Sequence, residues 1–149
     1  MNMTNLDEIM RFAIRKEADA AALYRMAADH AHPGMRDTFE ALAKEEEGHK
    51  KKLETFDWEK LDQAVVQDRK GLGIAEGLED VSFSSDMSYA ELLRMAIKTE
   101  EKSFKLYHGM AQMTQDPTLK KFLLLLAQEE STHKERIEKI YDKDILEWL

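Results

Sequence analysis

The sequence repeats itself, and this duplication restricts the chain to folds built from two copies of one unit. Residues Ala13–Glu17 correspond to Ala96–Glu100 at an offset of 83 residues. One residue is then added, so that Pro33 corresponds to Pro117 at an offset of 84. Chance is a poor explanation for many matches at a nearly fixed offset. We therefore interpret the chain as two copies of one helical hairpin.

Helical periodicity covers two blocks, residues 5–57 and 88–146. Each block is interrupted near a proline, Pro33 in the first and Pro117 in the second. Proline is tolerated at the first position of a helix, because the N–H that it lacks has no partner there. We expect helices at about 5–31, 33–57, 88–115 and 117–146.

The two blocks are joined by residues 58–87, whose glycines and serines indicate an irregular connection. A connection of this length is typical of a bundle with one long crossover. Ser88 and Glu91 have the spacing of a capping box at the start of the third helix, and Asp116 is a good N-cap for the fourth. The predicted fold class is all-α: one domain, residues 1–149, forming an antiparallel four-helix bundle of two repeated hairpins.

Acidic side chains and histidines interrupt the apolar stripe of every expected helix. Two glutamates lie on the first helices of the hairpins, and each second helix carries a Glu-x-x-His pair, which places both side chains on one face. At about 1.5 Å per residue, the glutamate and the pair of each hairpin lie roughly 20–24 Å from its turn. We expect these side chains to converge in one layer. They are Glu17, Glu46, His49, Glu100, Glu130 and His133.

This layer contains four carboxylates, which are costly to bury when ionised and repel one another. Protons, salt bridges or bound metal could offset their charge. Two divalent cations would balance the four glutamates, with neutral histidines as the other ligands. Mixed carboxylate and imidazole ligands suit iron, manganese or zinc better than calcium or magnesium. A single Glu-x-x-His is common by chance, but the matched set favours a dinuclear metal site. Glu45 and Glu129 are the competing ligands, although they fall off the stripe.

Tyr24 and Tyr107 each follow a candidate ligand by seven residues. They could hydrogen-bond to the ligating carboxylates from outside the metal's own ligand set. Alternatively, they are core aromatic residues with a satisfied hydroxyl. The sequence leaves both interpretations open.

Composition excludes several classes of function. The formal net charge of −8 argues against sequence-independent nucleic-acid binding. The absence of cysteine excludes disulfides, iron–sulfur centres and thiolate zinc sites within these 149 residues. No apolar run is long enough to span a membrane, and the N-terminus does not have the pattern of a signal peptide. We expect a cytoplasmic protein.

The pattern resembles the ferritin-like di-iron carboxylate superfamily, and most of all its rubrerythrin branch. The resemblance covers essentially the whole chain and includes the long crossover. The matching positions are Glu17, Glu46–His49, Glu100 and Glu130–His133. It implies that Glu46 and Glu130 bridge two irons, that Glu17 and Glu100 are terminal ligands, and that His49 and His133 each bind one iron.

The resemblance also implies an activity: reduction of hydrogen peroxide at a diferrous centre, which an electron donor then re-reduces. This would make the chain an oxidoreductase in protection against oxidative stress, and dimers are expected by analogy. Two departures matter. Without cysteine there is no rubredoxin domain, so electrons must come from a separate protein. Ser103 stands where rubrerythrins tend to have an additional glutamate.

The six-ligand set that remains is also that of bacterioferritin-type ferroxidase centres. Glu47 stands where bacterioferritin has its haem-ligating methionine, so no haem is expected. Three hypotheses follow. The first is a cytoplasmic di-iron enzyme that reduces peroxide or dioxygen. The second is a ferroxidase that sequesters iron without sustained turnover. The third is a metal-free helical interaction module.

Overall fold

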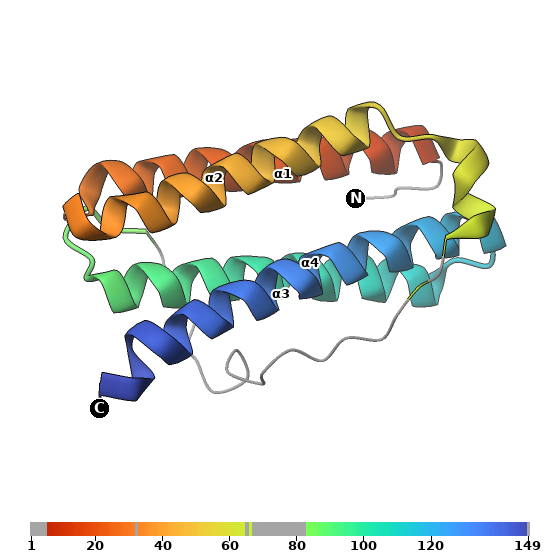
Figure 1. Cartoon of the computed structure of the whole chain (residues 1–149). Helices are drawn as coiled ribbons and strands as arrows, with labels where there is room; N and C mark the ends of the chain where they lie inside the picture. The colour runs from red at the N-terminus through yellow and green to blue at the C-terminus, as the bar shows by residue number, and fades with distance from the viewer. Residues whose placement is uncertain (1–5, 32, 65, 67–82, 149) are drawn as a thin grey trace. The chain divides into compact units, whose positions relative to one another are not determined.

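The structure, a computed structural model, describes residues 6–31, 33–64, 66 and 83–148. These residues contain helices and no strand, which confirms the all-α prediction. Each α-helix begins within one residue of its predicted start and ends one to three residues before its predicted end. The elements are α1 (Leu6–His30), α2 (Pro33–Glu54), η1 (Trp58–Gln63), α3 (Tyr89–Met113), α4 (Pro117–Asp144) and η3 (Leu146–Trp148) (Figure 1).

The helices group into two compact units, Met1–Glu59 and Lys60–Leu149. In the first unit α1 packs against α2, and in the second α3 packs against α4, with η3 also against α4. The prediction of two helical hairpins is therefore confirmed. Most of the predicted crossover, residues 58–87, lies outside the described residues. Its first six residues differ from the expected irregular chain, because they form the 3-10 helix η1.

Capping residues fix where α3 and α4 begin. The Ser88 hydroxyl accepts a hydrogen bond from the Glu91 backbone N–H, and the Glu91 carboxylate accepts one from the Ser88 N–H, both at 3.2 Å. The Asp116 carboxylate accepts hydrogen bonds from the N–H groups of Thr118 at 3.0 Å and Leu119 at 3.4 Å. Both predicted N-caps are confirmed. They satisfy backbone donors that have no partner within the helix.

The turns account for the single-residue change in the repeat offset. Two residues, 31 and 32, separate α1 from α2, whereas three residues, 114–116, separate α3 from α4. The spacing of thirteen residues between each repeated glutamate and the turn end of its helix is the same in both hairpins. The added residue therefore lies in the connection and not in a helix.

The buried stripe of α1 is wider than predicted. Alternating steps of three and four residues through Glu17 predict a narrow buried seam that includes Met10 and Ala20. Both of these residues are partly exposed, whereas Ile9 and Ala21 are buried. A helix packed in a globular core buries a stripe of about 100° or more, so residues next to the seam are included. The predicted seam lies on the buried face of α1, but that face is wider than the seam.

Polar contacts join the two ends of the second hairpin. The Tyr89 hydroxyl donates to the Asp144 carboxylate at 2.7 Å, and Arg94 donates to the Tyr141 hydroxyl at 3.1 Å. Both pairs connect the start of α3 to the end of α4. They hold the two helices antiparallel and in one register.

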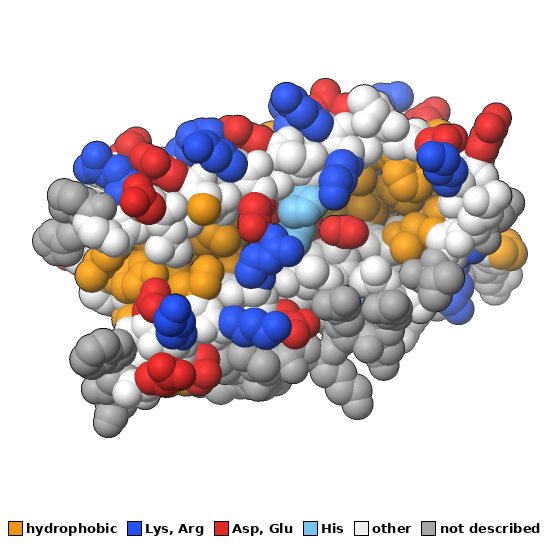
Figure 2. Space-filling view, in the orientation of Figure 1, with side chains coloured by type: hydrophobic (Ala, Val, Ile, Leu, Met, Phe, Trp, Pro, Cys, Tyr) orange, Lys and Arg blue, Asp and Glu red, His pale blue; other side chains and the backbone are white. Residues whose placement is uncertain are grey.

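The surface is charged and mixed in sign. On the face drawn in Figure 2, Lys and Arg side chains are interspersed with Asp and Glu side chains. Within the described residues, we find no helix that combines the length and apolarity needed to cross a membrane.

We predict that Ser88→Ala lowers the free energy of unfolding by about 1 kcal/mol, because the capping box loses its hydroxyl acceptor. Urea denaturation followed by helical circular dichroism measures this change. Ser85→Ala, in the exposed turn before α3, is the matched control. Equal stability of the two variants would show that the capping hydroxyl contributes nothing measurable.

Candidate metal centre

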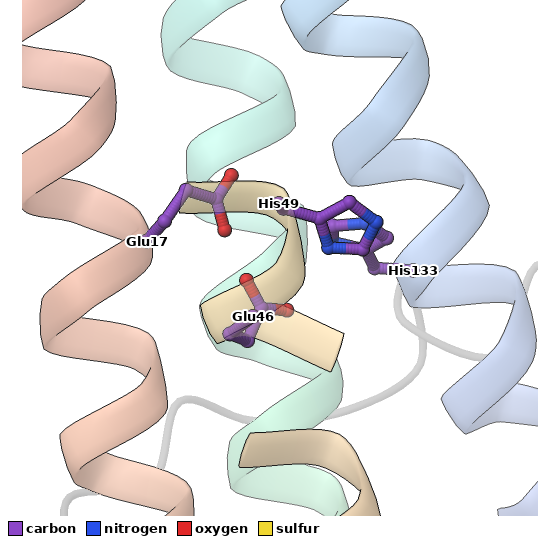
Figure 3. Close-up of side chains that lie close together, drawn as sticks. All are labelled: Glu17, Glu46, His49 and His133. Atoms are coloured by element: carbon purple, nitrogen blue, oxygen red, sulfur yellow. The ribbon is translucent and has the colours of Figure 1, made fainter. Parts of the chain in front are cut away.

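In the first hairpin, one glutamate of α1 and a Glu-x-x-His pair of α2 come together. Glu17, Glu46 and His49 each offer a ligand-type atom, and these atoms lie within 4.8 Å of one another. Figure 3 shows the carboxylates of Glu17 and Glu46 side by side, with the His49 ring on the same side of α2 as Glu46. Glu17 is 4 % exposed and Glu46 is 3 % exposed.

Equal arm lengths explain why these side chains meet. Glu17 precedes the end of α1 at His30 by thirteen residues, and Glu46 follows the start of α2 at Pro33 by thirteen residues. Both therefore lie about 20 Å from the turn. His49 follows Glu46 by three residues, close to one helical turn, which keeps it on the same face.

The second hairpin repeats this construction. Glu100 precedes the end of α3 at Met113 by thirteen residues, and Glu130 follows the start of α4 at Pro117 by thirteen residues. Glu100, Glu130 and His133 offer ligand-type atoms within 4.8 Å of one another. All three are nearly inaccessible to water, at 1 %, 3 % and 3 % exposure.

The separations in the second hairpin suit a bound cation better than direct hydrogen bonds. Nδ1 of His133 lies 3.7 Å from Oε2 of Glu100 and 3.9 Å from Oε2 of Glu130. Direct N–H···O hydrogen bonds span about 2.7–3.2 Å. A metal ion about 2.1 Å from each of two ligand atoms holds those atoms up to about 4.2 Å apart. One nitrogen and two oxygens of this group are therefore spaced as ligands of one ion.

The charge of each group also matches a cation. Each hairpin buries two carboxylates beside an imidazole, which is buried in the second hairpin and partly exposed in the first. With a neutral imidazole, two ionised carboxylates carry a charge of −2, which one divalent ion balances. The mixture of carboxylate oxygen and imidazole nitrogen is typical of iron, manganese and zinc sites. The residues of both groups thus fit a metal ion by chemistry, burial and spacing.

The two histidines differ in environment. His133 is buried, whereas His49 is partly exposed.

Tyr24 and Tyr107 are fully buried, which agrees with both interpretations of these residues. Their proposed hydrogen bonds to the ligating carboxylates stay a prediction.

The competing glutamate of α4 occupies a different place from Glu130. Oε2 of Glu129 lies 3.9 Å from Nε2 of His133, whereas Oε2 of Glu130 lies 3.9 Å from Nδ1, the other ring nitrogen. The Glu129 side chain is 53 % exposed, whereas that of Glu130 is 4 % exposed. The buried group in the second hairpin includes Glu130 and not Glu129.

A second set of buried charges in the same hairpin was not predicted. Glu101, Lys134 and Glu138 are all at most 4 % exposed. Lys98 and Lys105, three residues before and four residues after Glu101, form ion pairs with it at 3.2 and 2.7 Å. This i−3, i+4 spacing of opposite charges was the available signal.

Two opposing effects act on the pKa of Glu101. Burial raises the pKa, and hydrogen bonds from Lys105 and Lys98 lower it by more. The pKa of this carboxyl group consequently lies below its ordinary value. Glu101 thus has its own cationic partners and needs no metal.

Comparison with known families agrees with this geometry. A family model described as Rubrerythrin matches residues 8–71 and 91–147, which include all six candidate ligands. No match was found among curated proteins or among solved structures. The matched segments cover well over half of the chain. With its two helical hairpins and its duplicated Glu/His groups, the chain belongs to the rubrerythrin family of ferritin-like di-iron carboxylate proteins.

Proposed function

We propose that the protein is a non-haem di-iron oxidoreductase that reduces hydrogen peroxide or dioxygen with electrons from a separate donor protein. One observation carries the proposal: each hairpin buries two carboxylates beside an imidazole, at the same depth from its turn. Membership of the rubrerythrin family supports iron as the metal.

Together the two groups would hold two ions. Two ions bring four positive charges, which balance the four glutamates. By analogy with the family, the residues that would hold the two ions are Glu17, Glu46, His49, Glu100, Glu130 and His133. When bound, two ferrous ions supply the two electrons that convert hydrogen peroxide and two protons into two water molecules.

The chain's own residues prepare such a site. Burial of Glu100 and Glu130 removes the water that would otherwise compete for their oxygens. Nδ1 of His133 faces the same oxygens, so that a neutral imidazole can donate its lone pair to an ion bound there. These helix-mounted side chains approach ligand positions before metal arrives, which lowers the ordering cost of binding.

A ferroxidase that sequesters iron is the second candidate, and Ser103 is the observation that favours it. Ser103 is 6 % exposed and lies on α3 one turn after Glu100. Ser103 provides a hydroxyl in place of the additional glutamate, so the site has no further carboxylate that could stabilise a ferric product. The remaining six-ligand set suits iron oxidation as well as peroxide reduction.

We predict that purified protein binds two iron ions per chain and that His49→Ala/His133→Ala abolishes this loading. The double variant removes both imidazole ligands and leaves the helical stripes largely intact. Anaerobic titration with Fe²⁺, followed by metal analysis, measures the stoichiometry, and circular dichroism checks the helix content. His30→Ala, at an exposed position at the end of α1, is the control. Undiminished loading of the double variant would refute the ligand assignment, and no loading of the wild type would favour the metal-free module.

We predict that metal raises the melting temperature and that chelation reverses the rise. A metal that binds only the folded state contributes about 2.7 kcal/mol at a free concentration 100 times its Kd. For a chain of this size that corresponds to a rise of roughly 5–10 °C. Calorimetry with Zn²⁺, which avoids redox chemistry, measures the shift. Zinc should leave the melting temperature of the double histidine variant unchanged. An equal rise in the wild type and the variant would show that zinc binds at another site.

We predict many turnovers of hydrogen peroxide per centre when a reduced donor protein is supplied. The diferrous centre is regenerated after each cycle, so peroxide consumption should exceed the amount of enzyme many-fold. A ferroxidase would instead consume ferrous iron in proportion to its sites and then stop. Stopped-flow measurement of donor oxidation distinguishes the two, with the double histidine variant as the blank.

A further inference from the structure

The imidazole of His133 lies between two consecutive glutamates of α4. Its Nδ1 faces Oε2 of Glu130 at 3.9 Å and Oε2 of Glu100 at 3.7 Å. Its Nε2 faces Oε2 of Glu129 at 3.9 Å. The two ring nitrogens therefore meet carboxylates of different kinds, two buried ones on one side and an exposed one on the other.

Helix geometry produces this arrangement. Glu129 and Glu130 precede His133 by four and three residues, and both spacings bring side chains into contact on a helix surface. The two positions differ by about 100° around the helix axis. One glutamate consequently points into the packed stripe and the other points toward solvent. The ring of His133 extends between them.

A neutral imidazole carries one proton, so only one of its nitrogens can donate a lone pair to a metal. The other nitrogen then bears the N–H, and metal-binding histidines direct that N–H to a carboxylate, a carbonyl or water. When Nδ1 of His133, which faces the two buried carboxylates, binds a metal ion, Nε2 carries the proton. The carboxylate of Glu129 lies on the Nε2 side, 3.9 Å away.

Exposure separates the two glutamates further. A carboxylate that is 53 % exposed stays hydrated and needs no cation to offset its charge, whereas one at 4 % does. The exposed side chain of Glu129 can also rotate with little steric cost. A small change in its torsion angles is enough to shorten 3.9 Å to a hydrogen bond.

We infer that Glu129 is a positioning residue: it accepts a hydrogen bond from Nε2–H of His133 and so fixes the tautomer that directs the Nδ1 lone pair at the metal. The inference rests on the proposed function, because it assumes that Glu100, Glu130 and His133 bind an ion. Glu129 itself is not a ligand. The same spacing recurs in the first hairpin between Glu45 and His49.

The first test uses the full-length protein loaded with Zn²⁺. Long-range ¹H–¹⁵N spectra of ¹⁵N-histidine-labelled protein identify the nitrogen of His133 that carries the proton and how fast that proton exchanges with water. We expect a slowly exchanging Nε2–H in the wild type and in Glu129→Gln, whose amide oxygen still accepts. In Glu129→Ala the same proton should exchange faster, because its acceptor is gone. An unchanged exchange rate in Glu129→Ala would overturn the inference.

The second test measures metal affinity by competition between the full-length protein and a chromophoric chelator, with Zn²⁺ as the probe. We expect Glu129→Ala to weaken binding about 10–100-fold, the range found when such supporting carboxylates are removed. Glu129→Gln should recover most of the affinity. Glu135→Ala, which removes another α4 glutamate that is paired with Lys139 at 3.4 Å, is the matched control and should not change it.

Two outcomes separate this inference from the proposed function. Wild-type protein that bound no metal would refute the proposed function, and with it the role of Glu129. Wild-type protein that bound metal while Glu129→Ala bound it equally well would refute the role of Glu129 alone. Equal loss in Glu129→Ala and Glu129→Gln would also refute it, because the loss would then follow the charge and not the hydrogen bond.

Discussion

Both hairpins bury ionisable side chains. The rest of the structure must offset the free-energy cost of removing these groups from water. Glu100, Glu130 and His133 occupy positions of a helix stripe that leucine or alanine would otherwise fill. Buried charges contribute little stability by themselves, and well-packed apolar residues in their place are often more stabilising. The neighbouring apolar positions therefore supply the stability of the helices, and the acidic positions supply affinity for a cation.

The contrast between two adjacent residues shows how environment determines the role of a carboxylate. Glu100 and Glu101 are both buried, and two lysines bind the oxygens of Glu101, at 3.2 and 2.7 Å. These lysines balance the charge of Glu101. Glu100 instead lies with Glu130 and His133 in a group that could hold a metal ion. Glu129 and Glu130 differ in a similar way. Water offsets the charge of Glu129, whose side chain is 53 % exposed, whereas that of Glu130 is 4 % exposed. Residue type alone therefore does not identify a ligand.

Much of this arrangement follows from local rules that the sequence displays. The helices, the caps at Ser88 and Asp116 and the grouping of a glutamate with a Glu-x-x-His pair depend on residue spacing along one chain. Other features depend on packing between helices, which spacing does not specify. The burial of Lys134 and Glu138 is one such feature, and the direction of the His133 ring nitrogens is another. Tertiary contacts decide those details.

The thirteen-residue arms make each hairpin sensitive to insertions in a position-dependent way. A residue added within an arm would rotate every following side chain by about 100° and advance it by about 1.5 Å. The acidic side chain beyond that point would leave the stripe. A residue added at 31–32 or 114–116 leaves both arms unchanged, and these turns differ by one residue between the two halves while the thirteen-residue arms do not. A change in chain length is consequently accommodated at the turns of the hairpins and disruptive within their arms.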